Sequence, residues 1–252
     1  VVFSGTPPLE ALPTYRGAII TLPDISQGAS GAGFVSRLGD RDGVIRTAPL
    51  LSRLGDQVLP SLSLEALRAA QDAGSVQVRS TDGSGEVAAG QAAVVAVRVG
   101  EFEAPTTRSG ELWMHFTEEA PERIVPAWRI LTGDLPPEEM QRLFAGNIVF
   151  IGAGAVGLRD LVSTPVRERE LGVVVHAQAA EQMILGQFLT RPDWALGVER
   201  ILLVVFGVGL SFLAPRLGAV RGGALALVAL AGTATGSWTA FSTNGLLLEP
   251  TV

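Results

Sequence analysis

Residues 147–165 read NIVFIGAGAVGLRDLVSTP, and the interpretation of this stretch decides the fold and the kind of function expected of the chain. The run Ile148 to Ile151 is continuously apolar, which predicts a strand buried on both faces of a sheet. Gly152, Gly154 and Gly157 follow it with the spacing of a dinucleotide-binding fingerprint. The first question is therefore whether this loop binds a nucleotide.

The context of the glycines argues against a dinucleotide. Such a site needs a full helix after the glycines, because the pyrophosphate binds at the N-terminus of that helix. Thr164 and Pro165 stop helical geometry too early. The next predicted strand, Val173–Val175, is followed by His176, Ala177 and Gln178, so the acidic residue that binds the ribose is missing. We therefore expect no nucleotide cofactor.

Two interpretations of the stretch remain open. The glycines permit close packing of a strand on a helix, with Asp160 pairing locally or capping a turn. Alternatively, the backbone amides from Gly152 to Gly157 form an anion-accepting nest at the end of the strand. His176 is either a structural histidine bonded to a neighbouring loop or a pH-sensitive switch. The candidate ligand-binding residues are Gly152, Gly154, Gly157, Asp160, Thr164 and His176.

Composition excludes several kinds of chemistry. The chain has no cysteine, so thiol nucleophiles, disulfides and cysteine-rich zinc sites are impossible. All 19 basic residues are arginine, which excludes a P-loop or Schiff-base lysine. The two histidines, His115 and His176, are far apart, and no Gly-x-Ser-x-Gly elbow occurs, so we expect neither a metal site nor a catalytic residue. A net charge of -6 argues against nucleic acid.

Turn and periodicity signals predict a mixed domain before residue 195. Asp40-Arg41-Asp42-Gly43 lies between Gly33–Val35 and Val44–Arg46, which indicates a hairpin. A calcium loop is the rival, but its later oxygen ligands are missing. The cluster Arg167–Glu170 is expected to be a solvated loop.

The remaining pattern alternates helices and strands, which supports an α/β or mixed α+β sheet domain. The expected helices are Ser61–Gln71, Pro126–Leu131, Pro137–Phe144 and His176–Leu185. Further strands are expected at Val1–Phe3, Val76–Arg79, Val94–Val99 and Leu112–Phe116. No signal peptide is predicted at Val1, and the chain is expected to begin within a domain.

The C-terminal part differs from the rest of the chain in composition, because it is apolar and almost free of charged residues. We predict a soluble domain over 1–194, membrane helices over 195–215 and 222–248, and a loop over 216–221. Arg216 and Arg221 are the only charges in the loop, so the positive-inside rule places it in the cytoplasm and the domain outside. A pair of buried core helices is the alternative. The Gly- and Ala-rich second span predicts a homodimer.

Motifs along nearly the whole chain resemble the CHASE sensory family, second type (cyclases/histidine-kinases-associated sensory extracellular domain). They are Gly33–Val35 with Asp40–Arg46 and Pro49, Leu59–Ala66, Ile148–Ala153, Gly157–Asp160 with Thr164–Pro165, Gly172–Ala177, and Phe188–Leu189 with Arg191–Pro192 and Trp194. The resemblance implies an extracytoplasmic sensor domain with one span before it and usually three after it. The domain's opening, its first span and its last span are missing from the pattern.

The resemblance implies a bacterial receptor that passes an external stimulus to a cytoplasmic adenylate or guanylate cyclase, histidine kinase or Ser/Thr kinase. It implies no catalysis in this chain, and it transfers no defined ligand: a small molecule or a physical stimulus is expected. The expected location is the inner or plasma membrane, with several spans and the domain periplasmic or extracellular. The alternatives are a membrane-tethered nucleotide-binding enzyme using Gly152–Gly157 and a structural membrane assembly domain.

Overall fold

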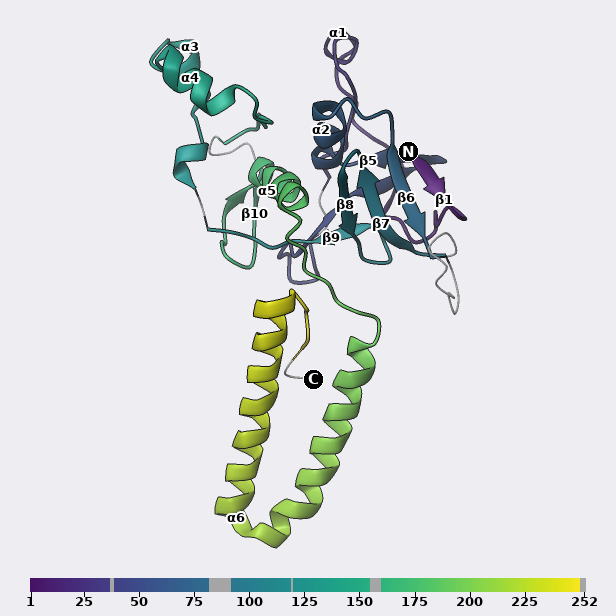
Figure 1. Cartoon of the computed structure of the whole chain (residues 1–252), viewed down its shortest axis with the longest axis vertical. Helices are drawn as coiled ribbons and strands as arrows, with labels where there is room; N and C mark the ends of the chain where they lie inside the picture. Colours follow the sequence, from purple (N-terminus) through teal and green to yellow (C-terminus); the bar gives the residue numbers. More distant parts are fainter. Residues whose placement is uncertain (37–38, 82–91, 119, 155–159, 250–252) are drawn as a thin grey trace. The chain divides into compact units, whose positions relative to one another are not determined.

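The computed structural model describes residues 1–36, 39–81, 92–118, 120–154 and 160–249. It divides into two units, Val1–Gly186 and the chain from Gln187 onward. Unit 1 is a mixed α/β domain, and unit 2 is a helical hairpin (Figure 1). The mixed α/β class predicted for the first part of the chain is therefore confirmed.

The largest sheet of unit 1 has the order β1-β6-β7-β8. Its strands are β1 (Val2–Ser4), β6 (Val76–Ser80), β7 (Val94–Val99) and β8 (Phe102–Pro105). β1 is parallel to β6, and the other neighbours are antiparallel. In β6, Val76, Val78 and Ser80 are buried while Gln77 and Arg79 are exposed, so this strand has one covered face.

Two smaller sheets also contribute strands to the core of unit 1. One has the order β2-β4-β5, formed by β2 (Thr14–Tyr15), β4 (Leu51–Leu54) and β5 (Gln57–Pro60). The other pairs β3 (Thr47–Pro49) with β9 (Glu111–Trp113) in antiparallel fashion. Leu50, Leu51 and Leu112 are fully buried, which places part of the core between these strands. A short helix, α1 (Pro23–Ser26), has no buried residue.

Helix α2 (Leu62–Ala70) forms where the helical spacing predicts it. Ser61 caps its N-terminus, because its hydroxyl accepts the N–H of Leu64 at 3.3 Å. Ser63, Leu64 and Leu67 are buried. Pro60 is the last residue of β5, so it precedes the cap and does not belong to the first helical turn. The helix packs on β6, β7 and α5.

Helix α5 (Gly172–Leu185) includes Val173–Val175, so the strand predicted there is wrong. Valine disfavours helix only slightly, and burial overrides that preference. Val175, Ala179, Ala180 and Met183 form a buried stripe at helical spacing. The helix contacts α2, β3 and β8 and ends at Gly186, which has a φ of 65°. It is introduced by a two-residue ladder between β10 (Leu161–Val162) and β11 (Glu170–Leu171).

The central strand predicted over Asn147–Ile151 is also wrong. This run belongs to no strand, and Ile151 is 90% exposed. It follows a 3-10 turn, η1 (Pro121–Arg123), and two short helices, α3 (Ala127–Leu131) and α4 (Pro137–Phe144), which form as predicted. An apolar run becomes a buried strand only where neighbouring strands can pair with it, and the described sheets have no position for it.

Unit 2 is dominated by α6 (Ala195–Asn244), which is broken at Gly218 (φ 77°, ψ 166°) into two arms (Figure 1). Within it, Ala195–Leu213 and Val220–Asn244 are 19 and 25 residues long, and their most apolar 18-residue stretches have mean hydropathies of 2.0 and 1.4. Both are long and apolar enough to cross a membrane. The second helix ends at Asn244, before the predicted residue 248, because Gly245 adopts a left-handed C-cap with a φ of 64°.

Gln182 joins α5 to the backbone of β9 and the residues after it. Its side-chain oxygen accepts the N–H of His115 at 2.9 Å, and its amide nitrogen donates to the carbonyl of Trp113 at 2.8 Å. We predict that Gln182→Ala lowers the free energy of unfolding by about 2 kcal/mol or more, because two backbone groups lose their partners. Urea unfolding of the detergent-solubilised chain, followed by near-UV circular dichroism, measures this.

The matched control is Gln178→Ala, one turn earlier on α5. The side-chain oxygen of Gln178 is buried with no hydrogen-bond partner among the described residues. Its removal should therefore cost clearly less than the removal of the Gln182 side chain. An equal cost for the two variants would contradict the role given to Gln182.

Candidate functional site

Gly152 and Gly154 lie against the start of α5. A Cβ added to Gly152 would overlap the Cβ of Val173, a closer approach than real Cβ atoms show. A Cβ on Gly154 would lie 3.5 Å from Leu171 Cδ1, an ordinary contact. Close packing therefore accounts for Gly152. Gly157 lies outside the described residues, so the anion nest stays a hypothesis.

Asp160 and Thr164 lie on the segment that leads into α5. The carbonyl of Asp160 accepts the N–H of Gly172 at 2.8 Å, which satisfies the first donor of the helix. Thr164 is buried and forms a local turn: its N–H donates to the carbonyl of Arg167 at 2.7 Å, and its hydroxyl accepts the N–H of Arg167 at 3.1 Å. These contacts are structural, and ligand binding by either residue stays a prediction.

His176 lies one turn into α5 and is buried against α2 and the segment before residue 37. Its Nδ1 is 3.2 Å from the hydroxyl of Ser63, and that hydroxyl donates to the His176 carbonyl at 2.9 Å. Its Nε2 is 3.3 Å from the carbonyl of Val35. Because a carbonyl can only accept, Nε2 carries a proton in this contact. The contacts support the structural interpretation, and the pH switch stays a hypothesis.

The candidate residues that the structure describes thus gather around the first turns of α5 and the segment that precedes it. Sequence reasoning missed the partner Ser63, which looks like any other position of an amphipathic helix. It also placed Glu170 in a solvated loop, which is wrong. Glu170 is buried in β11, and one of its carboxylate oxygens accepts the N–H of Leu171 at 3.0 Å. Neither feature has a signal in local sequence.

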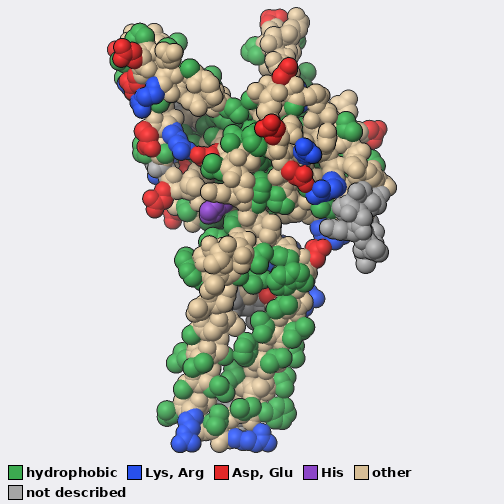
Figure 2. Space-filling view, viewed as in Figure 1, with side chains coloured by type: hydrophobic (Ala, Val, Ile, Leu, Met, Phe, Trp, Pro, Cys, Tyr) green, Lys and Arg blue, Asp and Glu red, His purple; other side chains and the backbone are tan. Residues whose placement is uncertain are grey.

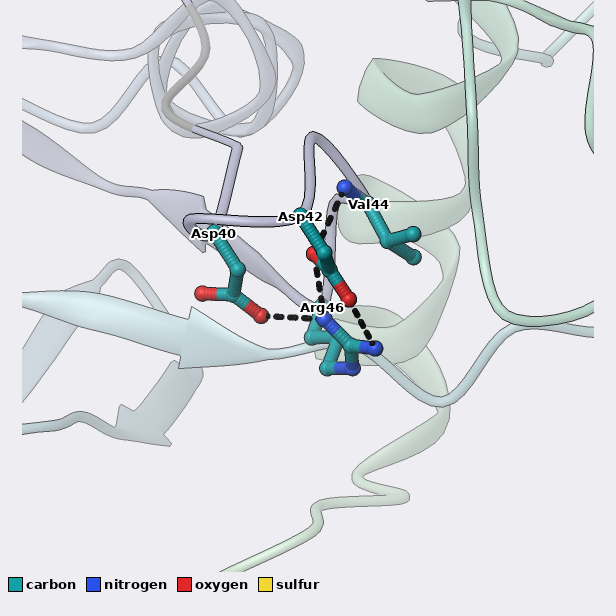
Figure 3. Close-up of polar contacts among 4 residues, drawn as sticks. All are labelled: Asp40, Asp42, Val44 and Arg46. Atoms are coloured by element: carbon teal, nitrogen blue, oxygen red, sulfur yellow. Dashed lines mark hydrogen bonds and ion pairs between the residues drawn. The ribbon is translucent and has the colours of Figure 1, made fainter.

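The turn at residues 40–43 carries a charge cluster (Figure 3). Arg46 donates to the carboxylate of Asp40 at 2.7 Å and to that of Asp42 at 2.8 Å. The N–H of Val44 also donates to Asp42, at 3.0 Å. The hydrogen bond from Arg46, helped by the one from Val44, lowers the pKa of Asp42 from 3.8 to about 2. The same bonds raise the pKa of Arg46. Both carboxylates that a calcium loop would use are paired with an arginine.

The tight turn is confirmed, and the N–H of Asp40 donates across it to the carbonyl of Val44 at 3.1 Å, but among the described residues the predicted arms form no two-stranded ladder with each other. Gly43 has a φ of 79° and its N–H donates to the carbonyl of Asp40 at 2.8 Å. The two flanking arms, however, pair with other segments: Phe34 bridges to Ser61, and Val44 bridges to Ser163. The turn therefore connects the start of α2 with the segment before β11.

Comparison with known proteins identifies one family. The model of the CHASE2 domain matches residues 6–213, which is unit 1 from near its start and the first arm of α6. Neither a comparison with curated proteins nor one with solved structures finds a match.

We predict that Gly152→Ala destabilises unit 1 by about 1–3 kcal/mol, the usual cost of overpacking. The new methyl group would overlap the side chain of Val173. Gly154→Ala is the control and should be nearly neutral. The double variant Gly152→Ala/Val173→Ala should recover part of the loss in urea unfolding. Equal effects of the two glycine substitutions would contradict the packing role.

We predict that Asp42 stabilises the fold in a pH-dependent way. Because folding lowers its pKa from 3.8 to about 2, its contribution is fully present above about pH 4 and is lost as the pH falls through 2. The difference in unfolding free energy between the unchanged chain and Asp42→Asn should follow this course. In an Arg46→Gln background the pH dependence should largely disappear; its persistence there would show that Arg46 is not the cause.

Proposed function

This chain belongs to the CHASE2 domain family, a family of sensory domains in signalling receptors, and we propose that it is the extracytoplasmic sensory part of a bacterial transmembrane receptor. Unit 1 receives the stimulus, which is a small molecule or a physical change. The helical hairpin anchors the unit in the inner or plasma membrane. The output is a nucleotide cyclase, a histidine kinase or a Ser/Thr kinase carried by the parent protein.

The apolar surface of the hairpin is the observation that carries this proposal. In the most apolar 18-residue stretch of each helix, only 6% of the residues in Ala195–Leu213 and 0% of those in Val220–Asn244 are buried. Figure 2 shows apolar side chains along both arms. A core helix of a soluble protein is covered by its neighbours, whereas a membrane helix exposes its apolar residues to lipid. A lipid bilayer is thus the partner that suits both arms.

The charges of the hairpin support one orientation. Between residues 201 and 248 the only charged residues are Arg216 and Arg221. Both lie near the break at Gly218, at the far end of the arms from Trp194 (Figures 1 and 2). Positive residues stay on the cytoplasmic side of a membrane. The proposal therefore places the bend in the cytoplasm and residues 1–194 outside.

A homodimer through the second arm is part of the proposal. Val228, Gly232, Gly236 and Ala240 recur every four residues on one face of that arm, and they help to line a shallow open groove. Small residues at this spacing let membrane helices approach closely. No described observation supports the nucleotide-binding enzyme: residues 160–165, before Gly172, contain a short strand and no helix.

The orientation can be tested because the chain has no native cysteine. Asp56→Cys places a single thiol on an exposed turn of unit 1, and Leu217→Cys places one beside the bend. In intact spheroplasts, a membrane-impermeant maleimide should label Cys at position 56 but label position 217 only after lysis. Labelling of both positions before lysis would contradict membrane crossing, and the reverse pattern would contradict the orientation.

A further inference from the structure

The two ends of the hairpin in unit 2 are joined by backbone hydrogen bonds. The N–H of Thr190 donates to the carbonyl of Gly245 at 2.9 Å, and the N–H of Leu247 donates to the carbonyl of Thr190 at 2.9 Å. Thr190 and Leu246 thereby form a parallel bridge. The segment before the first helix, which we call the linker (Phe188–Arg191), is thus paired with the exit segment (Gly245–Glu249) after the second.

A charge cluster reinforces this pairing. Arg191 donates to the carboxylate of Glu199 at 2.8 Å and to that of Glu249 at 3.0 Å. The second carboxylate oxygen of Glu199 accepts the backbone N–H of Glu249 at 2.8 Å. Glu199, on the first turns of the first helix, is therefore bonded to both the linker and the exit segment. Its side chain is only 3% exposed, against 63% for Glu249, so Glu199 is the centre of the cluster.

The backbone is shaped to fit the same contact. Gly245 has a φ of 64°, and a Cβ there would lie 2.5 Å from the carbonyl oxygen of Phe188. Only glycine both ends the helix and allows this approach. Ser237 adds a bond from the second helix, because its hydroxyl donates to the carbonyl of Leu248 at 2.7 Å.

We propose that the linker, Glu199 and the exit segment form a latch that passes a displacement of the linker directly to the chain following the second helix. The two helices then act as an anchor, and the signal does not have to travel along them. The proposal deepens the proposed sensory function and rests on it. Three of these bonds join the linker directly to the exit segment: Thr190 to Gly245, Leu247 to Thr190, and Arg191 to Glu249. Neither segment can therefore leave the pairing without releasing the other.

Reciprocal perturbation tests the coupling. The full chain in lipid nanodiscs is studied by hydrogen exchange read at single amides. Arg191→Gln changes the linker, and the readout is the amide of Leu247, whose acceptor is unchanged. Gly245→Ala changes the exit segment, and the readout is the amide of Thr190. Because breaking a charge-assisted bond is worth about tenfold or more in an opening equilibrium, exchange at Leu247 should speed up at least that much in Arg191→Gln. Exchange at Thr190 should also speed up in Gly245→Ala, because the added methyl group would overlap the carbonyl of Phe188.

Matched variants separate the latch from a general loss of order. Arg200→Gln, on the same first turns of the helix, should leave both amides unchanged. Glu249→Gln should have a smaller effect than Arg191→Gln, because its carboxylate is largely exposed and its N–H still bonds to Glu199. Amides of the two helices should stay protected in all variants.

Unchanged exchange at Leu247 in Arg191→Gln, or an equal effect of Arg200→Gln, overturns the latch. Free exchange along both helices of the unchanged chain would instead overturn the membrane anchoring on which the proposed function depends. One experiment therefore distinguishes failure of the latch, which is measured at the amide of Leu247, from failure of the membrane anchoring, which is measured at the amides of the two helices.

Discussion

The constraint on which the rest depends is that the hairpin cannot cover its own apolar surface. In Ala195–Leu213 only Ala195 and Glu199 are buried, and in Val220–Asn244 only Gly222 is. The cost of hydrating apolar surface grows with its area, so a surface of this length needs lipid or a partner. The polar groups of unit 2 follow from the same constraint: between Arg200 and Glu249 only the two arginines near the bend are charged, and Glu199 and Glu249 are paired with Arg191.

The sequence correctly predicts those helices and turns whose ends are set by a single residue. Ser61 caps α2, Gly186 ends α5 and Gly43 makes a tight turn, and each acts through its own side chain or backbone freedom. The wrong predictions concern short apolar runs whose secondary structure depends on the elements that pack against them. Asn147–Ile151 has no neighbouring strand, and Val173–Val175 is helical because α5 buries one face against α2. A short apolar run does not contain that information.

The candidate site shows the same limit. The glycine spacing indicated that the backbone there approaches another element closely. Gly152 does lie close to Val173, but the sequence did not identify Val173 as the partner. His176 contacts Ser63 and Val35, which are 113 and 141 residues away in the chain. Arg191 and Glu249 are separated by 58 residues. Such pairs are decided by topology, and one sequence without its relatives does not reveal them.

The central claim is that both arms of the hairpin face lipid, and nitroxide accessibility tests it most directly. Single spin labels at Leu203 and Leu230, both exposed and neither on the face proposed for the dimer, are placed on the cysteine-free chain in bilayers. Labels that face lipid should show strong relaxation by oxygen, which dissolves in lipid, and weak relaxation by a polar nickel chelate. Strong relaxation by nickel would place the arms in water, and weak relaxation by both reagents would place them in a protein core.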